Sequence, residues 1–216
     1  MESMTIKNGI VLLDDGKLLP RDIVVSDGII QEIGSNLWCG NALEASGLLV
    51  LPGFIDLHTH GIGFTSVLSE EDSLEEYAAL EAEKGTTTFY PTLFASSEEI
   101  KRQLRVFREK TDSLRGLDQI GGFRLESPYL MKPGGGLNNG ITEINEVLTN
   151  EILEAGGGLI KIWDISPELP GAIDLIRRLS KDGIVCSFAH TRANIDECRA
   201  GVEGGREWPL TSSTRS

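Results

Sequence analysis

The pattern of hydrophobic and polar positions changes near residue 48 and divides the chain in two. Before this point, residues 5–13 and 22–33 are rich in β-branched and apolar side chains, and a turn signal at Asp27-Gly28 interrupts the second run. Around that turn, apolar and polar positions alternate, as they do in a hairpin with one solvated face. The pattern predicts a small antiparallel β-sheet over residues 1–47, the N-terminal portion of a β-sandwich.

From residue 48 to residue 205, short apolar runs alternate with helical patterns. Strands that alternate with helices predict a parallel sheet with right-handed crossovers. Five such units fit a (β/α)₈ barrel of the TIM type that is incomplete. We predict strands over residues 48–57, 86–91, 120–126, 159–165 and 184–190, and helices over residues 69–84, 96–108, 143–155, 170–182 and 195–203.

The first apolar run ends on two histidines. Residues 48–57 are apolar almost throughout, which predicts a strand buried on both faces, and His58 and His60 follow one residue apart. Side chains two positions apart in a strand point to the same side, so the two imidazoles converge at the carboxyl end of the strand. Converging imidazoles make half of a metal site, although two histidines can also end a strand without binding an ion.

The third histidine and one acid fall at the same edge of the predicted barrel. The chain has three histidines, and the last of them, His190, ends the fifth predicted strand, while Glu126 ends the third. Barrel active sites lie at the carboxyl ends of the strands. Three imidazoles and a carboxylate suit Zn²⁺, with Fe²⁺ as the alternative. We predict a divalent-metal site here; the competing interpretation makes Glu126 an acid bonded to a loop amide.

Composition and charge exclude several classes of protein. The formal net charge of −13 argues against a basic patch for nucleic acid, and no apolar stretch reaches the length of a membrane span. The N-terminus lacks the charged start and apolar core of a signal peptide. Three cysteines, an odd number without metal-type spacing, indicate reduced thiols and hence a cytoplasmic protein.

Several motifs, in order along the chain, resemble one known family. The stretch Pro52-Gly53-Phe54-Ile55-Asp56-Leu57-His58-Thr59-His60-Gly61 resembles the signature of the amidohydrolase superfamily. Four further motifs resemble the N-acetylglucosamine-6-phosphate deacetylase family: Gly85-Thr86-Thr87-Thr88-Phe89-Tyr90-Pro91-Thr92-Leu93, Leu125-Glu126-Ser127-Pro128-Tyr129-Leu130, Ser166-Pro167-Glu168 and Ser187-Phe188-Ala189-His190-Thr191-Arg192-Ala193.

The resemblance implies a metal-dependent hydrolase that removes the acetyl group from an N-acetylated amino-sugar phosphate. In this family the residues matching Glu126 and His190 hold the main metal, and those matching His58 and His60 can hold a second, so that one or two ions are implied. The resemblance also implies a homodimer for the full-length protein. Another cyclic amidohydrolase with a different amide substrate, and a non-catalytic fragment, stay open as alternatives.

Two departures from the family pattern concern the substrate. The family has His-Leu-Glu-Gly-Pro where this chain has Arg124-Leu125-Glu126-Ser127-Pro128, and a Gly-Ala-His that contacts the sugar where this chain has Gly136-Leu137-Asn138. Asn138 can hydrogen-bond a substrate but cannot carry charge, so the amide substrate can differ from the usual one. The loop over residues 133–136 is rich in glycine and reads as a lid or as a linker.

The largest departure is at the end of the chain. The family's further metal-binding histidine, in a Thr-His-Leu-Phe-Asn-Ala-Met motif, and its catalytic aspartate have no counterpart, so we assign no catalytic residue. Residues 206–216 are polar and aperiodic. Back-translation of this tail in another frame allows Ala, Thr, His, Phe or Leu, Phe, Asn and Ala in that order. We therefore expect a truncated form with a one-base frameshift, which sequencing the coding DNA would test.

Overall fold

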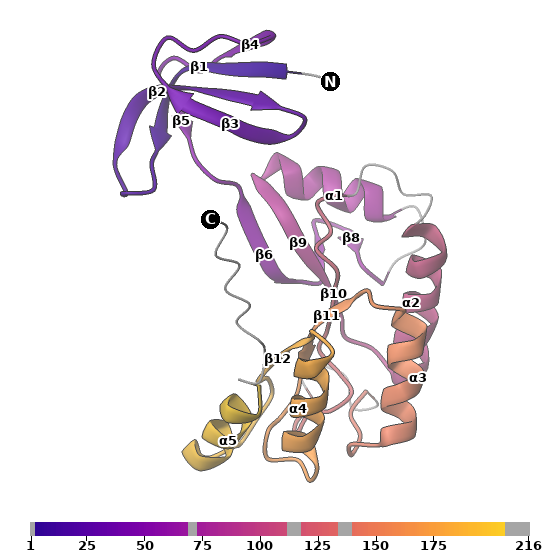
Figure 1. Ribbon diagram of the computed structural model, residues 1–216. Helices are drawn as coiled ribbons and strands as arrows, with labels where there is room; N and C mark the ends of the chain where they lie inside the picture. The colour runs from indigo at the N-terminus through magenta and orange to yellow at the C-terminus, as the bar shows by residue number, and fades with distance from the viewer. Residues whose placement is uncertain (1–2, 69–72, 112–117, 134–139, 206–216) are drawn as a thin grey trace. The chain divides into compact units, whose positions relative to one another are not determined.

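The computed structural model describes residues 3–68, 73–111, 118–133 and 140–205, which form two compact units (Figure 1). The division lies between Gly53 and Phe54, after the boundary predicted at residue 47. The predicted single strand over residues 48–57 is wrong, because Leu49–Val50 (β5) pairs in parallel with the first strand of the N-terminal sheet and a new strand begins at Phe54. Proline has no N–H for a ladder, so Pro52-Gly53 is a natural place for this break.

The N-terminal unit is one mixed sheet. Its central strand β1 pairs antiparallel with β2, and β2 with β3, as the hairpin pattern predicted. The turn between β2 and β3 uses Asp27 and Gly28, both with positive φ, as tight hairpins require. The sheet is not wholly antiparallel, however, because β4 and β5 run parallel to β1. The strands are β1 (Ser3–Leu12), β2 (Leu18–Ser26), β3 (Ile29–Gly34), β4 (Asn41–Glu44) and β5 (Leu49–Val50).

Asp22 is the polar centre of this sheet. Its buried carboxylate accepts hydrogen bonds from the Lys7 ammonium (2.8 Å) and from the N–H groups of Asn8 (2.8 Å) and Leu37 (3.0 Å). These contacts, the one from Lys7 foremost, lower the pKa of Asp22 to about 2. The carboxylate therefore ties together two strands and the segment after β3.

We expect Asp22→Asn to lower the melting temperature of this sheet. The difference in melting temperature between the variant and the parent should depend on pH. Because the folded pKa lies below the ordinary value of about 3.9, the ionised group stabilises the sheet above about pH 4 and loses that effect as the pH falls through about 2. Thermal melts of both proteins across this range test the idea. A difference that stays constant down to the lowest pH would contradict it.

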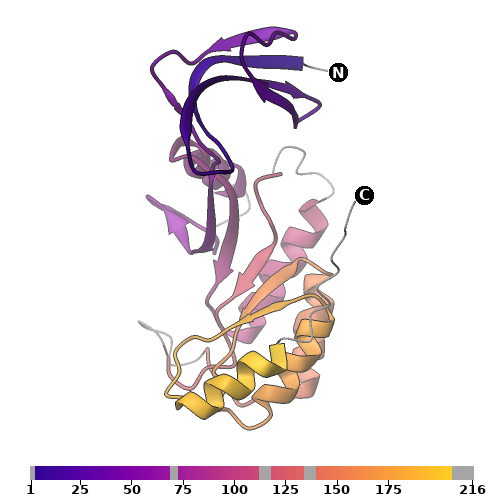
Figure 2. The same cartoon turned by 60° about the vertical axis from the view of Figure 1, so that its left-hand side comes forward.

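The second unit is an open parallel sheet with helices outside it, which confirms the incomplete barrel (Figures 1 and 2). Its strand order is β12-β11-β10-β9-β6, with all neighbours parallel. The strands are β6 (Phe54–Thr59), β9 (Thr86–Leu93), β10 (Phe123–Leu125), β11 (Ile160–Asp164) and β12 (Val185–Ser187). The helices are α1 (Ser73–Glu83), α2 (Ser97–Thr111), α3 (Glu146–Gly156), α4 (Ala172–Lys181) and α5 (Ile195–Gly205).

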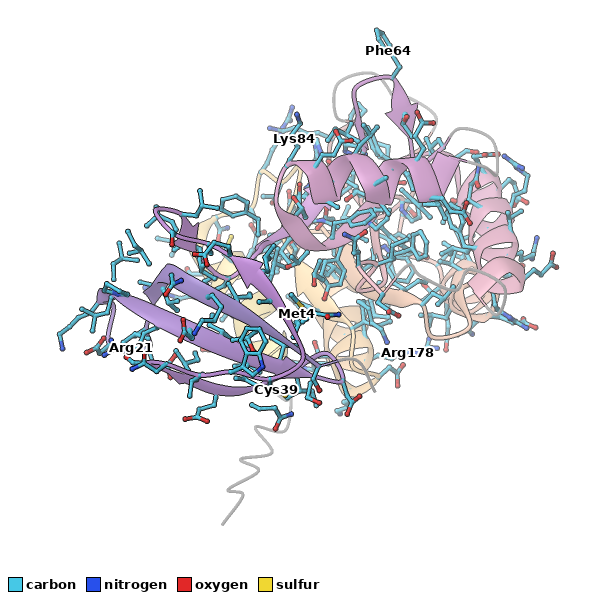
Figure 3. All side chains as sticks on the ribbon, turned by 90° about the horizontal axis from the view of Figure 1, so that it is seen from above. Met4, Arg21, Cys39, Phe64, Lys84 and Arg178 are labelled. Atoms are coloured by element: carbon cyan, nitrogen blue, oxygen red, sulfur yellow. The ribbon has the colours of Figure 1, made fainter. Side chains whose placement is uncertain are left out.

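A short hairpin, β7 (Gly61–Ile62) and β8 (Thr65–Ser66), follows β6. Phe64 at its tip points into solvent (Figure 3).

Side chains cap the starts of two helices. The Ser96 hydroxyl accepts a hydrogen bond from the Glu99 N–H before α2, and the Asn145 side chain accepts one from the Leu148 N–H at the start of α3. Among the helices in the described ranges, none has the length and apolar character needed to cross a membrane.

The core of the second unit lies between the sheet and the helices. Trp163 of β11 is fully buried and stacks on Tyr129, with ring centroids 5.7 Å apart. The expectation of a first barrel strand buried on both faces is wrong, because Phe54 and Ile55 are 68% and 63% exposed. The reason is position: β6 is an edge strand whose one pairing in the described sheet is with β9.

The exposed apolar edge of β6 should make this chain self-associate. An edge strand offers unpaired N–H and C=O groups, and apolar side chains beside them favour pairing with another copy. We expect Ile55→Lys to shift the protein toward monomer in analytical ultracentrifugation. Val147→Lys is the matched control, because Val147 is similarly exposed (67%) but lies on α3. Equal association of the parent and the Ile55 variant would contradict this.

Candidate metal centre

The carboxyl ends of three strands bring the predicted ligands together. His58 lies in β6 and His60 directly after it, Glu126 follows β10, and His190 follows β12 by three residues. Parallel strands present their carboxyl ends at one edge, so residues distant in sequence meet there. The structure thus assembles the histidines and the acid that the motif spacing singled out.

Glu126 is the centre of the cluster. Its Oε2 lies 2.8 Å from His60 Nε2 and 3.0 Å from His58 Nε2, and its Oε1 lies 2.7 Å from His190 Nε2. The two nitrogens of His58 and His60 are 3.2 Å apart. Within the described chain, the group of His58, His60 and Glu126 offers ligand atoms within 4.8 Å of one another. His190 contacts the other oxygen of the same carboxylate.

The backbone around His60 determines which of its nitrogens faces the cluster as an acceptor. His60 Nδ1 lies 3.0 Å from the carbonyl oxygen of Thr92, which can only accept, so Nδ1 must carry a proton. Neutral His60 therefore turns a lone pair at Nε2 toward Glu126, which is also an acceptor. Two acceptors this close need a cation or a proton between them, and carbonyl-fixed imidazoles are typical of metal ligands.

The pKa shifts follow from the same geometry. The hydrogen bond with Glu126 raises the pKa of His60, against the effect of burial. Burial raises the pKa of Glu126, but hydrogen bonds from His60 and His190 outweigh it and lower that pKa to about 2. The negative charge of Glu126 that favours a proton on His60 would also favour a cation at the same place. Imidazole nitrogens and a carboxylate oxygen form a donor set that fits a borderline divalent ion such as Zn²⁺.

The cluster has a buried floor and an open side. The Glu126 side chain is 8% exposed, whereas those of His58 and His60 are 37% and 48% exposed. Phe94 stacks on the His190 ring, with centroids 6.0 Å apart and an interplanar angle of 9°. The histidines are therefore held on one side and accessible on the other, as a site that admits a small molecule requires.

Arg124 lies two residues before Glu126, at a position where the resembling family has histidine. Its guanidinium donates two hydrogen bonds to Asp164 (2.7 and 3.0 Å), one to the Leu57 carbonyl (3.1 Å) and one to Ser187 Oγ (3.1 Å). Asp164 is fully buried, and that burial raises its pKa, while Arg124 acts in the opposite direction. The pair is bidentate, the strongest common form of a side-chain ion pair.

The Ser166-Pro167-Glu168 motif supports the His190 loop. Ser166 Oγ donates to the Ala189 carbonyl (2.9 Å), and the Glu168 carboxylate accepts from the Arg192 N–H (2.5 Å) and the Thr191 hydroxyl. His190 itself has a positive φ of 47°, a conformation that needs such support. Interactions of this kind hold the imidazole over Glu126.

Sequence reasoning missed three residues of the site: Thr92, Phe94 and Asp164. Asp164 could have been found, because it lies at the carboxyl end of a predicted strand. Thr92 acts through its backbone carbonyl, and Phe94 through its ring, so neither has a signal in the sequence. Asn138, the glycines of the proposed lid and the tail over residues 206–216 lie outside the described residues.

Comparisons with known proteins agree with the motifs. No family model matches the chain. It is 27% identical to N-acetylglucosamine-6-phosphate deacetylase of Lysinibacillus sphaericus, and the match covers 94% of this chain and 54% of that protein. It is 30% identical to the enzyme of the same name from Vibrio furnissii, and that match covers 88% of this chain and 50% of the relative. An aspartate-to-alanine mutant of the Mycobacterium smegmatis deacetylase, solved with N-acetyl-D-glucosamine-6-phosphate, aligns with a TM-score of 0.81 at 26% identity, over 95% of this chain and 54% of the other.

The chain spans about half the length of the curated relatives it matches. Within that span the agreement covers both units and is found independently in sequence and in three-dimensional structure. By both measures, the chain is similar to the N-acetylglucosamine-6-phosphate deacetylases.

Proposed function

We propose that this chain carries the metal-binding part of a hydrolase that removes the acetyl group from an N-acetylated amino-sugar phosphate. The observation that supports this most directly is the convergence of three imidazole Nε2 atoms on the two oxygens of Glu126. The named activity of the relatives supports the choice of substrate. Because the chain spans only about half the length of these relatives, the activity of the whole protein is also a proposal.

Glu126 and His190 would hold the main ion, and His58 and His60 would complete that site or hold a second ion. We propose Zn²⁺, with Fe²⁺ as the alternative, because imidazole and carboxylate suit both. When bound, such an ion polarises a carbonyl group and makes water a nucleophile near neutral pH.

The residues of this chain contribute position and charge. Glu126 supplies a buried negative charge, and the Thr92 carbonyl keeps the Nε2 lone pair of His60 directed at the site. Asp164 is engaged by Arg124, so it does not act as a free base. We therefore expect these residues to bind metal without completing the reaction, for which the family resemblance implies a further aspartate.

The test is an acetate-release assay on the protein expressed from its complete coding DNA, with the reading frame corrected if the shift is found. We expect release from N-acetylglucosamine-6-phosphate that a chelator stops and zinc restores. The 216-residue chain should be inactive in the same assay. Robust, chelator-insensitive release, or no release by the longer protein, would refute the proposal. A homodimer of the longer protein belongs to the proposal and is measured by light scattering.

A second candidate is a cyclic amidohydrolase that acts on a different amide. The replacement of the family's sugar-contacting histidine by Asn138 favours it, because an amide cannot supply a positive charge to a phosphate-bearing substrate. The same assay distinguishes the two: hydrolysis of a cyclic amide such as dihydroorotate, without acetate release from the amino sugar, would favour the second.

A further inference from the structure

His58, Glu126 and His190 come together only if the carboxyl ends of their strands keep fixed positions. Backbone hydrogen bonds between the strands fix these positions only in part. The residue pairing between β6 and β9 shifts between Asp56 and Thr59, the segment that carries His58. At the other edge of the sheet, the three-residue strand β12 pairs with β11 alone among the described strands. His58 therefore lies on a weakly paired segment, and His190 follows a short edge strand by three residues.

Arg124 reaches both of these edges. It lies on β10, whose strand neighbours are β9 and β11, yet its guanidinium contacts Leu57 of β6 and Ser187 of β12. Because β9 lies between β10 and β6 in the strand order, the contact to Leu57 reaches beyond the neighbouring strand. Leu57 precedes His58 directly, and Ser187 lies three residues before His190.

Asp164 keeps this guanidinium in place. The two-pronged ion pair orients the planar group, so its remaining N–H groups point at the Leu57 carbonyl and the Ser187 hydroxyl. With Asp164 fully buried and the Arg124 side chain 12% exposed, the pair is shielded from water. A lysine could supply the charge but not this fork of donors.

We propose that Arg124, clamped by Asp164, is a positioning residue for the metal cluster. It holds the carboxyl ends of β6 and β12 at the separation that brings His58 and His190 to Glu126. This inference rests on the proposed metal-binding function, and it assigns a role to the arginine that stands where the resembling family has histidine.

The test uses Co²⁺ as a spectroscopic probe for the whole chain and its variants. Arg124→Met removes the fork and the charge, Arg124→Lys removes the fork alone, and Ser187→Ala removes the contact to β12. Supporting groups around metal ligands typically contribute about 10–100-fold in affinity. We expect such a loss for Arg124→Met, a smaller loss for Arg124→Lys and Ser187→Ala, and an altered Co²⁺ absorption spectrum for both Arg124 variants.

Arg177→Met is the matched control, because it removes an exposed arginine–aspartate pair on α4. It should leave Co²⁺ affinity and spectrum unchanged. Far-UV circular dichroism establishes that each variant is folded; if Arg124→Met is not, Arg124→Lys decides. Unchanged affinity and spectrum in a folded Arg124 variant would overturn the inference.

A parent chain that does not bind Co²⁺ would count against the proposed function instead. The positioning role of Arg124 is then tested without metal, by the imidazole NMR signals of the three histidines. We expect one sharp set in the parent, and broadened or doubled signals for His58 and His190 in the Arg124 variants. Identical, equally sharp signals would overturn it.

Discussion

Replacing Glu126 by glutamine should weaken zinc binding by more than about 100-fold, a larger effect than the roughly 10–100-fold loss expected for a supporting group. Glutamine has the same shape but no charge, and its amide presents hydrogens where the carboxylate presents lone pairs. Three imidazole nitrogens lie within 3.0 Å of this carboxylate, so every ligand of the cluster is affected. Zinc is measured by competition with a chromophoric chelator and by elemental analysis after purification without chelator.

Two further variants make this result specific. His190→Ala should also abolish most of the bound zinc, although its nitrogen contacts the other oxygen of Glu126. Glu151→Gln makes the same chemical change on α3, where the carboxylate pairs with Lys101, and should leave zinc binding intact. Zinc content that is equal in the parent, Glu126→Gln and His190→Ala proteins would show that the ion binds elsewhere.

Replacing Trp163 by alanine should destabilise the barrel unit by about 3–5 kcal/mol, the usual cost of truncating a large buried aromatic side chain. Trp163 is fully buried at the centre of the core, and its ring stacks on Tyr129. A domain is stable by only about 5–15 kcal/mol, so this one substitution removes a large share of that free energy of unfolding. Urea denaturation followed by far-UV circular dichroism measures the loss.

Trp163→Phe separates ring packing from hydrogen bonding. The indole Nε1 is buried and has no hydrogen-bond partner in the structure, so its removal leaves no polar group newly unpaired. We expect phenylalanine to keep most of the stack and to be less than half as destabilising as alanine. A phenylalanine variant as unstable as the alanine variant would mean that the indole nitrogen makes an important contact after all.

Much of the fold could be predicted from the sequence. Five strand–helix units follow from runs of apolar residues and helical periodicity, and the Asp27-Gly28 hairpin follows from turn chemistry. The place of Leu49–Val50 in the N-terminal sheet could not be predicted in the same way. An apolar run is compatible with either sheet, and only the pairing of Leu49 with Ile10 assigns this segment to the N-terminal unit.

The site, like the fold, has some features that the sequence predicts and others that it does not. By itself, the sequence determined that His58, His60, Glu126 and His190 lie at one edge of a parallel sheet, because periodicity and the positions of strand ends are local properties of the chain. The tertiary structure alone decided that the Thr92 carbonyl sets the tautomer of His60 and that Arg124 bridges β6 and β12. These contacts join residues that are far apart along the chain, and only strand pairing and a buried ion pair bring them within hydrogen-bond distance.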